Sequence, residues 1–295
     1  MTGRIIKGIG GFYYIYVEGS GLYECKAKGI FRNMGIKPMV GDTVEIELLD
    51  EEKMLGNLTE IKKRKNELIR PAVSNVDQVI IIFAAADPAP NLNLLDRFLI
   101  VMNRQQVKTF ICFNKSELVD DEYLEELSEI YKDCGAKVLF TSNVTGRGID
   151  EVRSLVDGNT TVFAGPSGVG KSTTLNTIYP DAGAVSGEIS KKIKRGKHTT
   201  RHSEIIHIAK DTYIMDTPGF STLYIDEFEK SELWQYFPEF LPYENECRFA
   251  GCSHIGEKEE LCGIKTAVAH GKISKVRYES FVGLFKELED KRKYR

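Results

Sequence analysis

Apolar and polar residues alternate along the first 68 residues, in the short stretches that half-buried strands produce. Aromatic and β-branched residues fill 12–17, and the alternation returns over 23–28 and 44–48. Gly19–Gly21 and Gly41–Asp42 supply turns between these stretches. Several short strands in so few residues predict a small barrel. An OB-fold is one interpretation, and an SH3-like barrel or a plain β-appendage is the other.

Residues 72–225 have a different pattern, in which apolar strands alternate with helical stretches. This alternation predicts an α/β domain with a mostly parallel sheet. A stripe at helical spacing, from Leu94 to Met102, separates the first two strands. Buried strands are expected at 79–86, 109–113, 137–140, 160–164, 204–208 and 212–215.

Residues 226–295 are acidic and are predicted to be mostly helical, with a cysteine cluster in the middle. The last predicted helix has an apolar face made by Tyr278, Phe281, Phe285 and Leu288. We therefore expect three domains, a β-barrel (1–68), an α/β domain (72–225) and a helical domain (226–295).

Composition restricts the class of protein. Hydrophobic residues make up 42% of the chain and charged residues 28%, which is typical of a globular protein in water. The longest apolar run, 79–86, is too short to cross a bilayer, and residues 1–7 lack the apolar core of a signal peptide. We therefore expect a cytoplasmic protein without membrane contact.

A phosphate-binding loop is predicted between the strand 160–164 and a helix over 173–179, because the sequence there fits G-x-x-x-x-G-K-[ST]. Glycines allow backbone N–H groups to surround phosphate oxygens, and the helix N-terminus adds its positive dipole end. Lys171 is expected to bridge the β- and γ-phosphates, and Ser172 to ligate Mg²⁺. The expected nucleotide-binding residues here are Gly165, Pro166, Ser167, Gly168, Val169, Gly170, Lys171, Ser172 and Thr173.

Two earlier loops have the residues with which GTPases read guanine. The first consists of Asn114, Lys115, Ser116 and Glu117, and it looks like the Asn-Lys-x-Asp element with glutamate in place of aspartate. Its carboxylate can accept both N–H donors on the Watson–Crick edge of guanine, where adenine presents an acceptor, so the wrong base is rejected. The longer reach of Glu117 is expected to affect affinity more than base choice. Thr141, Ser142 and Asn143 follow the strand 137–140 and resemble the second base-contacting loop, in which Ser142 is the expected binding residue.

The residues that respond to the γ-phosphate are expected after the phosphate loop. Asp216 ends a strand, as the Mg²⁺-holding Walker-B aspartate does, and Gly219 lets a backbone N–H approach the γ-phosphate. Thr200, in preference to Thr199 in the same basic loop, is expected to complete the Mg²⁺ shell and to sense the γ-phosphate. The alternative is a solvated basic loop whose threonines have no such role. Phe220 stands where many GTPases have the glutamine that orients water, so intrinsic hydrolysis should be slow. His198 is the catalytic candidate, with an ordinary exposed loop histidine as the alternative.

The order of these motifs along the chain is permuted. In an ordinary GTPase the phosphate loop comes first, whereas here Asn114 and Ser142 precede Lys171 and Asp216. The termini of compact domains usually lie close together, so joining them is sterically easy. As a consequence the segment after Asp216 leads directly into the third domain, and nucleotide state is expected to act there without a long relay.

A cluster of three cysteines and one histidine lies in the third domain, at Cys247, Cys252, His254 and Cys262. In a cytosolic chain such a cluster favours a metal over disulfides. Three thiolates and one imidazole suit tetrahedral Zn²⁺ in a closed structural site. Free buried cysteines beside an exposed histidine are the alternative.

The barrel, the permuted motifs and the Cys247-x4-Cys252-x-His254-x7-Cys262 pattern together resemble the RsgA (YjeQ) family of circularly permuted small-ribosomal-subunit biogenesis GTPases, over nearly the whole length. The resemblance implies OB-fold, GTPase and zinc domains that hold GTP or GDP, Mg²⁺ and one zinc ion. It also implies binding to the small (30S) ribosomal subunit late in its assembly, slow hydrolysis stimulated by that subunit, and help in releasing another assembly factor. We expect a monomer.

Other functions stay open on the residues alone. The net charge of −3 does not suggest a nucleic-acid binder overall, but basic runs at 62–65, 191–202 and 291–295 are consistent with rRNA contact. Such runs are more often solvated surface. The alternatives are a passive RNA-binding scaffold with a structural nucleotide, and a GTPase that acts on another RNA or protein. An ATPase or kinase is disfavoured by Asn114–Glu117.

Overall fold

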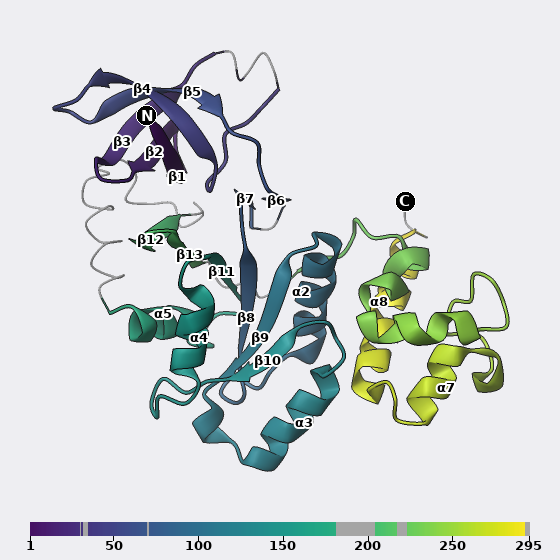
Figure 1. The fold of residues 1–295 in the computed structure, drawn as a ribbon. Helices are drawn as coiled ribbons and strands as arrows, with labels where there is room; N and C mark the ends of the chain where they lie inside the picture. The colour runs from purple at the N-terminus through teal and green to yellow at the C-terminus, as the bar shows by residue number, and fades with distance from the viewer. Residues whose placement is uncertain (30, 32–34, 70, 181–203, 217–222, 293–295) are drawn as a thin grey trace. The chain divides into compact units, whose positions relative to one another are not determined.

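The computed structural model of the chain describes all residues except 30, 32–34, 70, 181–203, 217–222 and 293–295 (Figure 1). The chain divides into two compact units. Unit 1 comprises Met1–Ile80, Gly148–Ser167 and Lys171–Gly219, and unit 2 comprises Ile81–Arg147, Gly168–Gly170 and Phe220–Arg295.

Five strands of unit 1 form a closed barrel in the order β1-β2-β3-β5-β4. Neighbouring strands are antiparallel except β3 and β5, which are parallel. The five-stranded barrel confirms the OB-fold interpretation of the first segment. The strands are β1 (Thr2–Ile9), β2 (Phe12–Val17), β3 (Gly21–Ala27), β4 (Thr43–Asp50) and β5 (Leu55–Ile61). A two-stranded sheet, β6 (Glu67–Leu68) and β7 (Val73–Ser74), follows the barrel.

The α/β domain contains a six-stranded sheet of order β10-β9-β8-β11-β13-β12. Strands β9 and β10 are parallel, as are β11 and β13, whereas the edge strand β12 is antiparallel to β13. This mostly parallel arrangement confirms the expected α/β class. The strands are β8 (Gln78–Ala84), β9 (Lys108–Asn114), β10 (Lys137–Phe140), β11 (Thr160–Ala164), β12 (Ile205–Ala209) and β13 (Thr212–Asp216).

Helices follow the strands in the alternation that the sequence predicted. Leu94, Leu95, Phe98, Leu99 and Met102 of α2 are buried, which confirms the predicted stripe. The helices are α2 (Leu92–Arg104) after β8, the short η1 (Ser116–Leu118) and α3 (Asp121–Tyr131) after β9, α4 (Ile149–Val156) after β10, and α5 (Lys171–Ile178) after β11.

The last part of unit 2 is helical, but its first half is irregular. Pro238 begins η3 and Pro242 lies inside it, so this backbone cannot continue as a regular α-helix. No helix in the described part of the chain has the length and apolar character needed to cross a membrane. The elements are η2 (Lys230–Tyr236), η3 (Pro238–Glu246), η4 (Glu259–Leu261), α7 (Gly263–Ala269) and α8 (Lys275–Arg292).

Helix α8 is held by a buried charge as well as by its apolar face. Arg277 has no exposed surface, and its Nε donates to Glu239 Oε1 in η3 at 2.6 Å. Its Nη1 donates to Asp96 in α2. The guanidinium also lies over the rings of Tyr131 and Phe237, 5.4 and 4.7 Å from their centroids. One buried cation therefore connects α2, α3, η3 and α8.

Replacing Arg277 with Met should destabilise the protein strongly, because Asp96 and Glu239 would then share a buried site without a cation. Breaking a buried ion pair from one side costs about 3–5 kcal/mol. The free energy of unfolding from urea titrations measures this loss. Lys275→Met is the control, since Lys275 lies on the same helix and its side chain is 80% exposed. Equal losses in both variants would contradict the role given to Arg277.

Candidate functional site

The phosphate loop has the predicted strand–loop–helix structure, in which β11 ends at Ala164 and α5 begins at Lys171. In unit 1 the Lys171 side chain lies back over the start of the loop. Its Nζ donates to the carbonyl oxygens of Gly165 and Pro166 at 3.1 and 2.7 Å. Burial lowers the pKa of the Lys171 ammonium, and the charge of Asp216 opposes that shift. The ammonium group of Lys171, which the motif requires, is therefore held against the backbone of the loop.

The two described residues that were predicted to act at Mg²⁺ contact each other in unit 1. Ser172 Oγ donates to Asp216 Oδ2 at 2.6 Å. Asp216 Oδ1 has no hydrogen-bond partner among the described residues. A hydroxyl and a carboxylate are the hard oxygen donors that hold Mg²⁺ beside a phosphate loop, so this pair fits the ion.

Several predicted residues lie outside the described part of the chain. They are His198 and Thr200 in the basic loop, and Gly219 and Phe220 after Asp216. Their roles stay predictions.

Asn114, the last residue of β9, is the most constrained residue of the base-reading loop. It is 1% exposed, and its Nδ2 donates to the carbonyl oxygen of Val169 in the phosphate loop at 2.9 Å. Its Oδ1 accepts from Thr141 Oγ1 at 3.1 Å and from Asn143 Nδ2 at 3.3 Å. The amide orientation is thus fixed by three partners in unit 2. The sequence placed Thr141 and Asn143 beside Ser142 in the second base-contacting loop, but it did not predict that their side chains would hold the amide of Asn114.

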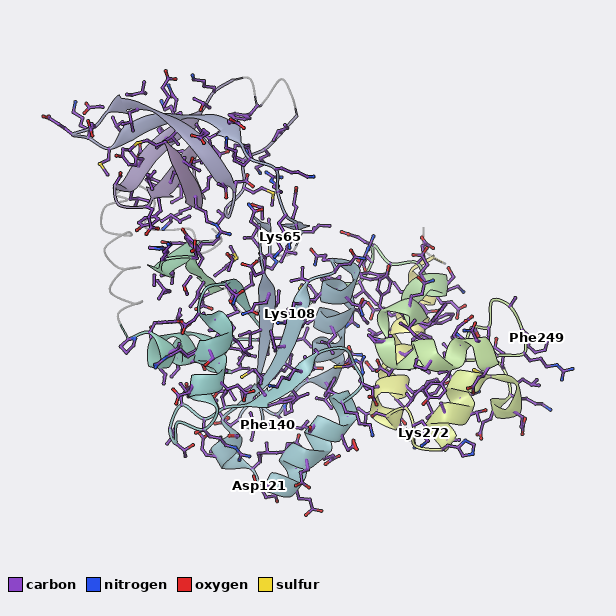
Figure 2. The ribbon with its side chains drawn as sticks, in the orientation of Figure 1. Lys65, Lys108, Asp121, Phe140, Phe249 and Lys272 are labelled. Atoms are coloured by element: carbon purple, nitrogen blue, oxygen red, sulfur yellow. The ribbon has the colours of Figure 1, made fainter. Side chains whose placement is uncertain are left out.

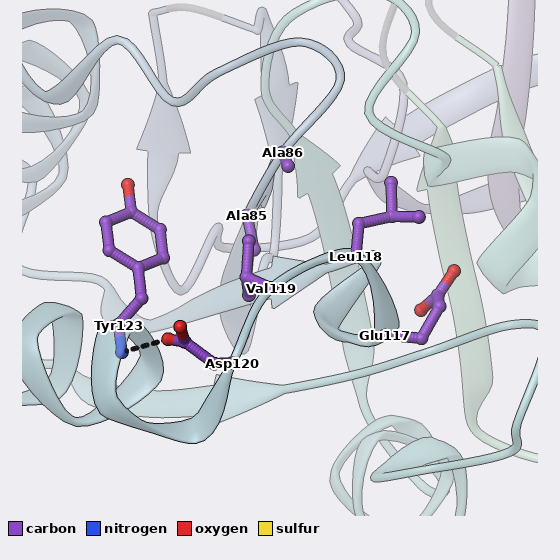
Figure 3. A pocket seen from close by; sticks show the side chains of 7 residues that line it. All are labelled: Ala85, Ala86, Glu117, Leu118, Val119, Asp120 and Tyr123. Atoms are coloured by element: carbon purple, nitrogen blue, oxygen red, sulfur yellow. Dashed lines mark hydrogen bonds between the residues drawn. The ribbon is translucent and has the colours of Figure 1, made fainter.

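The other three residues of the Asn114–Glu117 element differ from one another in burial and in hydrogen-bond partners. Lys115 adopts a left-handed φ of 59°, and its Nζ donates to the carbonyl of Asp87. Ser116 N–H donates to the carbonyl of Thr141 at 3.1 Å, which joins the two base-reading loops. Glu117 is exposed and lines an open pocket of about 750 Å³ with Ala85, Ala86, Leu118, Val119, Asp120 and Tyr123 (Figure 3). Its carboxylate is therefore accessible to a ligand.

Ser142 is directed toward its own loop. Its side chain is fully buried, and its Oγ accepts from the N–H groups of Val144 and Thr145 at 3.2 and 3.0 Å. Such side-chain to backbone bonds stabilise turns. In this structure Ser142 shapes the loop, while its neighbours bind Asn114; a direct contact with a base stays a prediction.

Cys247, Cys252, His254 and Cys262 come together in unit 2, with all four ligand atoms within 4.8 Å of one another. His254 Nδ1 lies 3.6 Å from the sulfurs of both Cys247 and Cys262, and those sulfurs are 4.0 Å apart. Zn–S bonds in a tetrahedral site place neighbouring sulfurs about 3.7 Å apart. His254 is 1% exposed, which contradicts the alternative of an exposed histidine beside free cysteines. The residues therefore fit a structural zinc ion.

The protonation of this cluster is set by its burial. Burial raises the pKa of the Cys252 thiol to about 12 and also raises the pKa of Cys262. Burial lowers the pKa of His254, which favours the neutral imidazole that a metal needs. Tyr278 Oη on α8 donates to the carbonyl of His254 at 2.7 Å and fixes the backbone of that residue.

Comparisons with known proteins agree with this geometry. Residues 61–226 match the model of the RsgA GTPase family, and residues 2–55 match the model of the RsgA N-terminal domain. The small ribosomal subunit biogenesis GTPase RsgA of Agathobacter rectalis is 56% identical to this chain, with all of both chains covered. The protein of the same name from Alkaliphilus metalliredigens is 47% identical over 99% of each chain.

Two solved structures are similar over nearly their whole length. The crystal structure of YjeQ from Thermotoga maritima has a TM-score of 0.81 and 34% sequence identity, with 97% of this chain and 98% of that chain covered. The structure of YloQ, described as a circularly permuted GTPase, has a TM-score of 0.77 and 34% identity, with 98% and 95% covered.

Gly170→Ala should weaken binding of GTP and GDP alike by about tenfold or more, which corresponds to at least about 1.4 kcal/mol. A Cβ at position 170 would lie 2.3 Å from Asn114 Nδ2, so the amide would have to move. Calorimetric titration with each nucleotide measures the effect. Gly158→Ala is the control, because it has the same kind of positive φ but open space around its Cβ. If that control weakened binding equally, the contact with Asn114 would not be the cause.

Binding of Zn²⁺ to the metal-free protein should release at least two protons at neutral pH, because the raised pKa values keep Cys252 and Cys262 protonated until the metal binds. The measurement is the dependence of the binding enthalpy on the ionisation enthalpy of the buffer.

The purified protein should contain one zinc ion, and Cys262→Ser should lose it. Cys112→Ser is the matched control, since Cys112 is a buried cysteine without a disulfide on β9, outside the cluster. Release of fewer than two protons, or retention of zinc by Cys262→Ser, would count against a zinc site here.

Proposed function

Because the chain belongs to the RsgA GTPase family, we propose that it is a GTP hydrolase that binds the small (30S) ribosomal subunit and assists its late maturation. The hydrogen bond from Asn114 to Val169 is the main structural support for this proposal. It joins the guanine-reading element to the phosphate loop, although 55 residues separate the two along the chain. Recognition of the base and of the phosphates is thereby built on one continuous set of contacts.

Catalysis in this proposal depends on positioning and on charge. Lys171 would neutralise the β- and γ-phosphate oxygens, and Ser172 and Asp216 would hold Mg²⁺, with Thr200 as the further ligand. The ion, when bound, neutralises charge that develops on the phosphates. Glu117 accepts the N–H donors of guanine, for which its exposed carboxylate is suited.

Hydrolysis is expected to be slow until a partner completes the site. Phe220 has no polar atom with which to orient an attacking water. We propose that docking on the small subunit brings His198 of the basic loop near that water. The switch in nucleotide state that follows would help to release another assembly factor.

Each of the three expected segments, 1–68, 72–225 and 226–295, has its own function in this proposal. We propose that the barrel contacts rRNA, that the middle segment binds GTP with Mg²⁺, and that the last segment is a zinc domain. The N-terminal family model ends at residue 55 and the GTPase model begins at residue 61, so both models divide the first two segments before residue 68. A monomer that works in the cytoplasm without membrane contact is the simplest form of this proposal.

The basic run 62–65 is a weaker candidate for rRNA contact in the structure than in the sequence. Lys62 pairs with Glu45 and Glu60, Arg64 with Asp42 and Glu67, and Lys65 with Asp77. These acids neutralise most of the run. An exposed aromatic is available elsewhere, because Phe249 is 51% exposed beside Arg248 in the loop between Cys247 and Cys252 (Figure 2). Such a ring can stack on an unpaired base.

Purified small subunits should accelerate GTP hydrolysis by the protein, while ATP should not be hydrolysed. Single-turnover rates with and without subunits measure this stimulation. His198→Ala should lose most of it, by about 10²-fold or more if His198 acts on the attacking water. Unstimulated turnover and nucleotide affinity should be unchanged in that variant.

His270→Ala is the matched control, because His270 is exposed and lies in the last segment. Equal stimulation of both variants would remove the role of His198 and leave the GTPase assignment intact. Absence of any stimulation of the unaltered protein would instead favour a passive scaffold or another activating partner.

A further inference from the structure

The side-chain amide of Asn114 has one hydrogen-bonding group left for a ligand. A primary amide has two lone pairs on its oxygen and two N–H donors on its nitrogen. Thr141 Oγ1 and Asn143 Nδ2 both donate to Oδ1 of Asn114, and one N–H of Asn114 donates to the carbonyl oxygen of Val169. The other N–H has no acceptor among the described residues. These contacts all lie within unit 2, so they belong to one compact part of the molecule.

The partners of this amide also determine its orientation. The carbonyl oxygen of Val169 can only accept a hydrogen bond, so the atom of Asn114 that faces it is Nδ2. Half a turn of the amide would set two oxygens against each other there, and would set Nδ2 of Asn114 against Nδ2 of Asn143. Because Asn114 is buried, water could not compensate for these losses. The remaining N–H therefore has a fixed direction before any ligand binds.

Asn143 reaches Asn114 from the turn that Ser142 stabilises. The hydroxyl of Ser142 accepts from two backbone N–H groups of this turn, and Asn143 is the residue that follows. Its half-buried side chain contacts Asn114, which lies 29 positions earlier in the chain. Its Nδ2 also lies 3.6 Å from the place where a Cβ on Gly170 would be. Asn143 is thus in contact distance of both the base-reading loop and the phosphate loop.

The two donors to Asn114 Oδ1 approach it from different sides of the molecule. Thr141 is fully buried, and it lies 3.2 Å from the thiol of Cys112 in the core of the sheet. Thr141 has a single hydroxyl proton, which it donates to Asn114, so the thiol is the donor in its contact with Thr141. Asn143 lies on the loop side and is partly exposed. Asn143 can therefore be changed without creating a cavity in the core.

We propose that Asn143 is a positioning residue for recognition of the base: it holds Oδ1 of Asn114, so that the remaining N–H of that amide is directed at the acceptor N7 of the purine ring. The inference rests on the proposed function, because it requires a guanine nucleotide in this site. A donor that is already oriented loses less conformational freedom when the nucleotide binds. Asn143 acts through Asn114 and not by its own side-chain contact with the base.

The first test uses GDP and 7-deaza-GDP, in which a C–H group replaces the acceptor N7, with affinities measured by calorimetry. The unaltered protein should bind GDP more tightly than 7-deaza-GDP by about 3- to 10-fold, the usual range for one neutral hydrogen bond. Most of this difference should be lost in Asn143→Ala. Binding of GDP should weaken by about threefold or more, whereas binding of 7-deaza-GDP should be nearly unchanged, because it has no acceptor for the oriented N–H.

Asn93→Ala is the matched control for this measurement. Asn93 is an exposed asparagine on α2, and its Oδ1 accepts from Arg97 Nε at 2.9 Å. Both variants therefore lose one side-chain hydrogen bond of an asparagine in unit 2, but only Asn143 contacts Asn114. The ratio of the two affinities should stay at its original value in Asn93→Ala.

The second test reverses the polarity of the contact. Asn143→Asp keeps the shape of the side chain but places an acceptor against Oδ1 of Asn114, so the amide is pushed out of its orientation. The added negative charge should weaken binding of both nucleotides, because it repels their phosphates. The ratio of GDP affinity to 7-deaza-GDP affinity removes this common effect. That ratio should fall at least as far as in Asn143→Ala.

Equal weakening of both nucleotides in Asn143→Ala, with an unchanged ratio, would overturn the proposal and leave Asn143 as a purely structural residue of its loop. Equal affinity of the unaltered protein for GDP and 7-deaza-GDP would also overturn it, since the N–H of Asn114 would then have no acceptor on the base. Failure of the unaltered protein to bind GDP at all would overturn the proposed function instead, so the failures are distinguishable.

Discussion

The hydrogen bond between Asn114 and the backbone of Val169 is the constraint on which the nucleotide site depends. Because Asn114 is buried, its amide must find partners inside the protein, and it does so in the phosphate loop and in Thr141 and Asn143. The close approach is possible only because residue 170 has no side chain. Residues 168–170 of the proposed phosphate loop and the proposed base-reading loop are thus parts of one packing arrangement within unit 2, and a change in either must affect the other.

The permuted order becomes possible through a short turn where an ordinary GTPase has its two ends. Helix α4 ends at Val156, and β11 begins at Thr160. Gly158 occupies the turn with a φ of 73°, and its N–H donates to Thr212 Oγ1 at 2.9 Å. The join is therefore bonded to the first residue of β13. Because the usual chain ends are joined there, the new C-terminal end of the domain lies after Asp216. From Asp216 the chain continues to Leu223 and on to α8.

Patterns within short stretches of sequence predicted the strands and the phosphate loop. Contacts between residues far apart in the sequence were not predicted. Motif spacing located the phosphate loop, and the apolar patterns located every strand of the sheet to within about two residues. Strands β1 and β5 of the barrel were missed, because Arg4 and Lys7 interrupt the apolar pattern of β1 and Gly56 and Asn57 interrupt that of β5. The burial of Arg277 could not be foreseen, since its partners Asp96 and Glu239 lie 181 and 38 residues away. The turned-in hydroxyl of Ser142 likewise follows from loop geometry and not from its position at a strand end.

Because Arg277 is buried, exchange of the last segment between proteins is restricted. Its counter-charges come from η3, which is close in sequence, and from α2, which belongs to the sheet domain. The helical segment is therefore not an independent module that recombination can exchange at will. A last segment taken from another protein would leave Asp96 buried without its cation unless that segment also supplied an arginine where Arg277 lies.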